Sequence, residues 1–241
     1  MPVVMNFCDL TFPTPEENLA CDEALLDLCE EGLAGDILRF WEPTEYFVVV
    51  GYANKVSEEV HHTFCDFQGI PILRRCTGGG AVLQGAGVLN YSLILRADDE
   101  LHNISATNSF VLKRHCLELA AILRAPVEIQ GHTDLAVGGL KFCGNSQRRK
   151  KQFLLFHGSF LLNLDIDMVE QTLRLPSRQP DYRLGRSHSD FLMNLKVSSA
   201  LIKNALRKSW NATQLLPQIP APAIALLERE KYSRAEWNHK F

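Results

Sequence analysis

Three consecutive glycines, in the stretch RRCTGGGAV at residues 74–82, constrain this chain more than any other feature of its sequence. A glycine loses more backbone entropy on folding than any other residue, so a run of three is hard to order. Glycine also lets backbone N–H groups approach a ligand closely, and successive N–H groups in such a turn bind anions. The run therefore predicts either an anion-binding loop or an ordinary glycine turn with exposed arginines.

The residues around the glycines exclude two familiar phosphate loops. No Gly-Lys-Ser/Thr follows, as a P-loop requires, and the glycine spacing is not that of a dinucleotide-binding loop. Arg74 and Arg75 are adjacent on an expected strand, so their side chains should point to opposite faces. One arginine can then hold a bound carboxylate or phosphate while the other pairs elsewhere.

The rest of the sequence predicts an α+β fold with a mixed, mainly antiparallel sheet backed by helices, because the expected strands come in runs. Thr14 is the expected N-cap of the first helix. Helices are expected where apolar residues recur at helical spacing, over residues 14–33, 57–62, 105–124, 168–173 and 189–208. Strands are expected in β-branched and aromatic stretches, over residues 37–41, 46–52, 72–75, 81–83, 90–95, 127–129, 135–137, 140–143 and 153–162.

Chain length and patterning indicate one main domain. The 241 residues suffice to bury a core, and LPQIPAPA at residues 216–223 resembles a linker because it holds three prolines. We therefore expect one main domain over residues 1–215 and a short C-terminal tail over 216–241. The net charge of −3 does not favour a nucleic-acid partner. No apolar stretch approaches the ~20 residues of a membrane span, and the first residues lack the signal-peptide pattern.

The seven cysteines argue against a disulfide framework and against a structural zinc site. Their count is odd, they are scattered along the chain, and no Cys-x-x-Cys pair occurs. Reduced thiols are typical of cytoplasmic proteins, so we expect a cytoplasmic location.

A second stretch with potential chemistry is GHTDLAVGGLKFCGNSQRR, at residues 131–149. Lys141 is either a solvated surface group or a point charge that holds a carboxylate and a phosphate together. Cys143 follows two residues later and should share its strand face, where a cation lowers a thiol pKa; the alternative is a packed core thiol. His157, in an apolar strand, is expected to be a hydrogen-bonded structural residue. The basic run 148–151 is either a solvated loop or a docking patch for an acidic partner domain or a nucleotide phosphate.

Together these stretches resemble the lipoate–protein ligase A and octanoyltransferase family. RRCTGGGAVLQGAGVLNYSLIL resembles the family signature RRxSGGGAVxHxxGxLNxS, and GHTDLAVGGLKFCGNSQRR followed by FHGSFLLNLD resembles NDLxVxGKKIxGxAQRR followed by HGTLLxD. The resemblance runs from about residue 16 to about residue 195 and implies the biotin/lipoyl-ligase catalytic domain fold, with an apolar acyl tunnel. Gln84 stands where the family usually has histidine.

The resemblance also implies an ATP-dependent, Mg²⁺-assisted reaction. ATP and lipoate or octanoate would give an acyl-adenylate, which a lysine amine of an acidic lipoyl carrier domain would attack. Lys141 is implied as the catalytic residue, and Asp134 as a group that places magnesium or adenine. The residues implied to bind substrate or nucleotide are Arg74, Arg75, Thr77, Gly78, Gly79, Gly80, Ala81, Asn90, Asp134, Gly144, Asn145 and His157.

Two other functions stay open at this point. One is an ATP-independent octanoyl or lipoyl transferase with Cys143 or Cys76 as its thiol, although residues 126–135 are short and lack the cysteine of the usual arrangement. The other is a lipoate-binding module without turnover. The accessory domain of longer ligases would need roughly 80 residues, so we expect any accessory function to come from a separate subunit.

Overall fold

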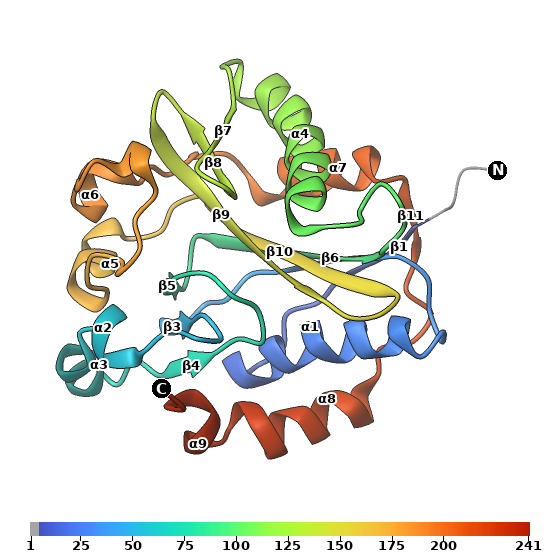
Figure 1. Cartoon of the computed structure of the whole chain (residues 1–241), viewed down its shortest axis with the longest axis horizontal. Coiled ribbons are helices and arrows are strands. Elements are labelled where there is room, and N and C mark those ends of the chain that lie inside the picture. Colours follow the sequence, from blue (N-terminus) through green and yellow to red (C-terminus); the bar gives the residue numbers. More distant parts are fainter. Residues whose placement is uncertain (1–4) are drawn as a thin grey trace.

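The structure, a computed structural model, describes residues 5–241 (Figure 1). Residues 1–4, which belong to the stretch expected not to be a signal peptide, lie outside the described residues. The strands are β1 (Met5–Asp9), β2 (Ile37–Trp41), β3 (Phe47–Val50), β4 (Ile72–Arg74), β5 (Val82–Gln84), β6 (Val88–Arg96), β7 (Glu128–Gln130), β8 (Asp134–Val137), β9 (Leu140–Arg149), β10 (Phe153–Leu161) and β11 (Ala212–Leu215).

The helices cover both faces of the sheets. They are α1 (Pro15–Glu30), α2 (Val56–Glu59), α3 (His62–Gln68), α4 (Ile104–Leu123), α5 (Ile166–Thr172), α6 (His188–Phe191), α7 (Ser199–Ser209), α8 (Ala221–Leu227) and α9 (Ala235–Asn238), with a 3₁₀ turn η1 (Asp181–Arg183) and a π-helical turn η2 (Glu228–Tyr232).

The predicted α+β class is confirmed. The main sheet has the order β11-β1-β2-β6-β10-β9-β8-β7, and a smaller sheet has the order β4-β3-β5. β1 pairs in parallel with β2 and β11, and β3 pairs in parallel with β4. The other pairs are antiparallel, so the sheet is mixed and mainly antiparallel as expected.

Alternating side chains build two cores on the main sheet. Leu93 of β6 faces the core under α4 and α7, and its neighbour Ile94 faces the core under α1 and α8. Figure 1 shows these helix pairs on opposite faces of the sheet. A third core joins the small sheet to α5. The face that packs on α1 is also the face that carries the candidate site.

The first expected helix forms as the sequence predicts. Thr14 accepts a hydrogen bond from the Glu17 N–H, and the Glu17 carboxylate accepts one from the Thr14 N–H. This capping box satisfies N–H groups that the first turn of a helix leaves free. The expected Thr14 cap is therefore confirmed.

Two helix predictions are wrong. The expected helix 189–208 is broken between α6 and α7, because the Leu195 and Lys196 N–H groups donate to carbonyls at the end of β10 and beyond. Apolar residues there hold an extended segment, and their spacing imitates a helix. The expected helix 57–62 is interrupted at Val60, which is extended and bridges Leu173.

The prediction of a linker over residues 216–223 is wrong from Ala221 onward, because α8 begins at that residue. Prolines occupy the first turn of this helix, where no intrahelical N–H bond is lost. The segment 216–241 packs on α1 through Ile224 and Tyr232 and reaches β4 through α9. The division at residue 215 stays a prediction, but the tail is a folded layer of the protein.

Candidate active site

The glycine loop, defined here as residues 77–81, joins β4 to β5 with its carbonyl oxygens turned inward. The buried Arg75 side chain donates to the carbonyls of Gly78 (2.5 Å from Nη2) and Gly80 (2.9 Å). Ser146 Oγ donates to Gly78 O as well (2.8 Å). Among the hydrogen bonds of residues 5–241, none uses a backbone N–H of this loop. The loop thus presents a run of unpaired amides, as an anion-binding nest requires.

Two glycines are required by this loop conformation. Gly79 has φ +87°, and a Cβ there would lie 2.8 Å from Arg75 Nη2. Gly51, after β3, lies so close beneath the loop that a Cβ would collide with the Gly79 carbonyl oxygen. Gly78 and Gly80 have neither a positive φ nor a close neighbour. In the triple glycine, only the central residue has to be glycine, and the two outer positions have room for a Cβ.

A buried chain of polar groups fixes the start of the loop. Thr77 Oγ1 lies 2.7 Å from His157 Nε2, and His157 Nδ1 lies 3.5 Å from Asp22 on α1. Burial would raise the pKa of Asp22, but the Arg39 guanidinium and His157 outweigh it and hold that pKa low. Arg75 Nε also donates to Thr77 Oγ1 (3.0 Å). The expectation that His157 is a hydrogen-bonded residue is confirmed.

The two adjacent arginines contact different partners, and both donate to backbone carbonyls. Arg74 is fully buried and donates to carbonyls at residues 51, 52, 54, 237 and 238. Arg75 is used by the glycine loop, and burial lowers its pKa to about 10, so it stays charged at neutral pH. The expected contact of an arginine with a ligand anion stays a prediction; the structure gives each guanidinium a task in ordering the backbone.

Lys141 lies beside Asp134 on the same face of the sheet. Its Nζ is 2.8 Å from Asp134 Oδ1, with a quarter of the lysine side chain exposed. Asp134 Oδ2 accepts a hydrogen bond from the Tyr182 hydroxyl (2.8 Å). A Cβ on Gly144 would lie 2.9 Å from the lysine Nζ, so the glycine makes room for this pair. Lys141 is thus held by a carboxylate that is itself held by the segment around η1.

The strand register brings this lysine next to the glycine loop. Gly144, beside Lys141, and Ser146, which binds Gly78, are two residues apart on β9, so they share a face about 7 Å apart. On β10 the residue opposite Ser146 is His157. Two stretches separated by some sixty residues in sequence therefore form neighbouring walls of one site.

The expectation that Lys141 and Cys143 share a face is wrong. A register shift between β8 and β9 pairs Ala136 with Lys141 but Leu135 with Cys143, so one extra residue reverses the alternation. Cys143 packs into the core under α4, and burial raises the pKa of its thiol. Burial likewise raises the pKa of Cys76 to about 11. Neither thiol has the lowered pKa of a nucleophile.

Behind the glycine loop, Gln84 and Asn90 form a reciprocal amide pair (2.8 and 3.1 Å), and Ser159 bonds to both. Gln84 thus satisfies a buried polar cluster at the position where the family usually has histidine. Asn145 lies on the other face of the sheet, where it bonds to Tyr91 and to the Thr133 carbonyl. Its expected contact with substrate stays a prediction without support from this geometry.

Several residues of the site escaped sequence reasoning. Asp22 and Arg39 form the buried ion pair behind His157, and Tyr182 and Ser146 complete the two walls. A carboxylate on the apolar stripe of α1 and an arginine inside the apolar strand ILRFW were available signals for the first two. The serine and the tyrosine had no such signal.

The basic run 148–151 is neither fully solvated nor a free patch. Arg148 bonds to Glu23 (2.8 Å), and Lys150 to Asp27, both on α1.

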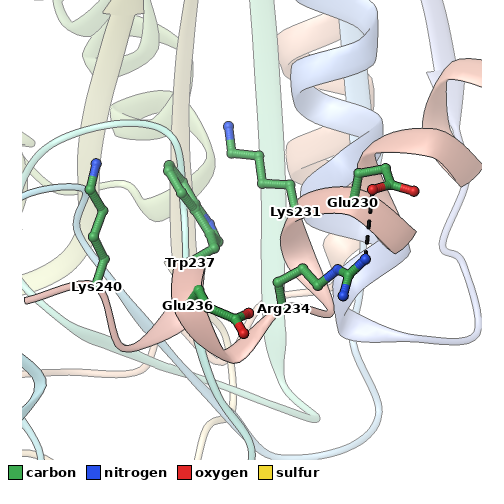
Figure 2. Close-up of a pocket in the computed structure, with 6 residues that line it drawn as sticks. All are labelled: Glu230, Lys231, Arg234, Glu236, Trp237 and Lys240. Atoms are coloured by element: carbon green, nitrogen blue, oxygen red, sulfur yellow. Dashed lines mark ion pairs between the residues drawn. The ribbon is translucent and has the colours of Figure 1, made fainter.

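Two surface hollows of about 540 and 620 Å³ lie away from the site. The first is lined by residues of η2 and α9 (Figure 2), and the second by residues of α3 and α5. The expected acyl tunnel stays a prediction.

The geometry does not favour Asp134 as a magnesium ligand. Both of its oxygens already contact Lys141 and Tyr182. Across residues 5–241, no three His, Cys, Asp or Glu side chains are grouped as a metal ion would need.

In the same part of the chain, no helix combines the length and apolarity needed to cross a bilayer.

Comparison with known proteins gives a consistent result. Residues 14–203 match the family described as the lipoyl protein ligase A/B catalytic domain. Lipoate-protein ligase A subunit 1 of Thermoplasma acidophilum is 27% identical, covering 92% of this chain and 90% of its own. Octanoyltransferase LipM of Brevibacillus brevis is 28% identical, covering 93% and 95%. A crystal structure of lipoate-protein ligase A bound with ATP superposes with a TM-score of 0.83 at 25% identity, covering 99% of each chain.

Proposed function

Because the chain belongs to the lipoyl protein ligase A/B catalytic domain family, we propose that it attaches lipoate or octanoate to a lysine of a lipoyl carrier domain through an acyl-adenylate. The family includes both ligases and octanoyltransferases among the relatives of this chain. The choice between them therefore rests on the chemistry of the site.

The observation that carries the proposal is the pairing of the amide run with Lys141 on one sheet face. Unpaired backbone amides hold phosphate oxygens, and a lysine supplies a full positive charge beside them. A site with both groups fits a junction between an acyl group and a phosphate. An anionic acyl-adenylate is such a junction.

Each residue then has a task in two steps. In the first, the carboxylate of the acid attacks the α-phosphorus of ATP and pyrophosphate leaves, while the loop amides hold the phosphate oxygens. In the second, the carrier amine attacks the acyl carbon and AMP leaves with the electrons of the broken C–O bond. Lys141 exchanges Asp134 for these oxygens and stabilises the negative charge that grows on them.

The thiols argue against the transferase alternative. A transferase of this group needs a cysteine whose thiolate forms readily. Burial raises the pKa of all seven cysteines in this chain. Even Cys116, which is only partly buried, has its pKa raised to about 11. The similarity to LipM keeps the alternative worth testing, but no thiol here is activated for it.

Pyrophosphate release with ATP and octanoate or lipoate tests the proposed ligase. We expect release that requires the acid, because adenylate formation consumes both substrates. Acyl transfer from an acyl carrier thioester without ATP, and without acid-dependent pyrophosphate release, would contradict the ligase and support the transferase. Acid binding with neither reaction would indicate a binding module.

The similar Thermoplasma acidophilum protein is named as subunit 1 of a lipoate-protein ligase A. We propose that a separate accessory subunit assists transfer here too. Adenylate formation should then proceed with this chain alone, whereas transfer should rise when the subunit is added.

A further inference from the structure

The end of the chain grips the strand that leads into the glycine loop. Trp237 Nε1 donates to the Arg74 carbonyl (2.8 Å), and Asn238 Oδ1 accepts from the Arg74 N–H (3.0 Å). In return the Arg74 side chain donates to the backbone carbonyls of both residues (3.0 and 3.1 Å). Figure 1 shows α9 and the C-terminal end beside β4. Two side chains thus replace the neighbouring strand that β4 lacks on this side.

The same C-terminal segment also packs near Cys76, the residue that precedes the glycine loop. Lys231 and Tyr232 both bond to the buried carboxylate of Glu23 on α1 (2.6 Å each to Oε2). Cys76 and Tyr232 belong to the same buried core. Residues 231–238, named here the C-terminal clamp, therefore bond to Arg74 and share a core with Cys76.

Between these two residues lies Arg75, whose side chain holds the loop carbonyls inward. The Arg75 side chain is placed by the backbone of residues 74–77. On one side this backbone bonds to the end of β3 and the segment after it: the Arg75 N–H donates to Val50 O, and the Thr77 carbonyl accepts from the Tyr52 N–H. β4 is the edge strand of its sheet, so only the clamp satisfies the outer N–H and C=O of Arg74. Loss of the clamp would free the backbone at the point where Arg75 is aimed.

We propose that the C-terminal clamp positions the glycine loop for nucleotide binding, with Trp237 and Asn238 as positioning residues that act through Arg74 and Arg75. The proposal rests on the proposed ligase function only for its consequence in catalysis. Whatever the reaction is, the contacts predict that loss of the clamp makes the backbone of residues 74–77 less ordered.

The aromatic ring of Trp237 has a second set of contacts that a test must leave in place. Figure 2 shows the ring between Lys231 and Lys240, whose ammonium groups lie 4.1 and 5.7 Å from its ring. Trp237→Phe keeps an aromatic ring there and removes the N–H donor. Asn238→Ala removes the bond to the Arg74 N–H, whereas Asn238→Asp keeps that acceptor and loses only the donor to the Tyr232 carbonyl. Glu236→Gln, on the same helix and lining the same hollow, is the matched control.

Hydrogen exchange of the Arg75 and Tyr52 amides is the readout that does not depend on activity. We expect faster exchange at both amides in Trp237→Phe and Asn238→Ala, slower exchange in Asn238→Asp than in Asn238→Ala, and wild-type exchange in Glu236→Gln. Pyrophosphate release should show a KM for ATP raised about tenfold, the equivalent of one lost bond to a charged group, with kcat within twofold.

Unchanged exchange and an unchanged KM in folded Trp237→Phe and Asn238→Ala would overturn the proposal. A lower melting temperature together with a wild-type KM for ATP would also overturn it, because the clamp would then only stabilise the fold. Should the wild type release no pyrophosphate, the ligase proposal fails, and the exchange data alone still decide on the clamp.

Discussion

The two walls of the site are built in opposite ways. The glycine loop is held by a buried arginine, a serine and a histidine–aspartate chain, and its backbone amides are unpaired. Lys141 is partly exposed and is held by Asp134, with one tyrosine behind that carboxylate. The loop wall is therefore arranged in advance, whereas in the proposed reaction the lysine exchanges Asp134 for the anion.

This difference separates binding from charge stabilisation. Fixed amides need no rearrangement to bind a phosphate, so defects in the loop should appear mainly as weaker nucleotide binding. The lysine contributes most when charge develops, so its loss should appear in the rate. Variants of the two walls should consequently differ in which kinetic parameter changes.

The largest effect is expected from Lys141→Ala. Removal of its charge should reduce acyl transfer by about 10²–10³-fold, the range for losing one group that stabilises transition-state charge. Lys151→Ala, at an exposed lysine of the same hairpin, is the control. Transfer to a lipoyl domain and circular dichroism measure activity and fold, and near-normal transfer in a folded Lys141→Ala protein would remove the lysine from the mechanism.

A smaller effect, mainly on KM for ATP, is expected from Gly79→Ala. The new Cβ meets Arg75 Nη2 and forces a strained backbone, so KM should rise roughly tenfold, as for one lost bond to phosphate. Gly80→Ala has open space and should stay within about twofold of the wild type. Equal kinetics for the two variants would show that the loop is not arranged in advance.

Tyr182→Phe should change the lysine wall only modestly. It removes the hydroxyl that Asp134 accepts from, which leaves the Lys141–Asp134 pair in place. We expect a change of about threefold in kcat, from one ordinary hydrogen bond, with an unchanged KM for ATP. A rise in KM for ATP comparable to that of Gly79→Ala would mean that the two walls are not separate.

The smallest effect on activity is expected at the thiols. Because burial raises the pKa of Cys76 to about 11, its thiol stays protonated at pH 8 and should react with iodoacetamide far more slowly than in the urea-unfolded chain. The thiolate fraction, and with it the labelling rate, should grow only as the pH rises towards 11. Cys143→Ala should transfer within twofold of the wild type. Rapid labelling at pH 8, or loss of transfer in Cys143→Ala, would favour the transferase.

Local sequence patterns predicted much of the fold, whereas the role of the two walls stays a proposal. Thr14 capped its helix, most strands lie where β-branched residues cluster, and the glycine run leaves its amides unpaired. These features depend on neighbouring residues alone. The extended segment 192–198 could not be predicted in the same way, because its apolar spacing is compatible with a helix until its carbonyl partners on β10 are known.

The errors at the site have a common physical cause: they depend on long-range register. One extra residue in β9 moved Cys143 to the opposite face from Lys141, and no local pattern marks that bulge. Arg74 bonds to Trp237 and Asn238, more than 160 residues away, so no local pattern shows that this arginine orders the C-terminal end; the contact of an arginine with a ligand anion stays a prediction. The charged residues inside apolar segments, Asp22 and Arg39, were the one readable sign of this buried network.

Mass spectrometry of a purified lipoyl domain tests the central claim most directly. The domain is incubated with this protein and octanoate or lipoate, with and without ATP and magnesium, and with the accessory subunit where one is found. The account predicts that one acyl group is added to one lysine only when ATP is present. Acylation of equal extent without ATP, from a carrier-bound acyl group, would contradict it.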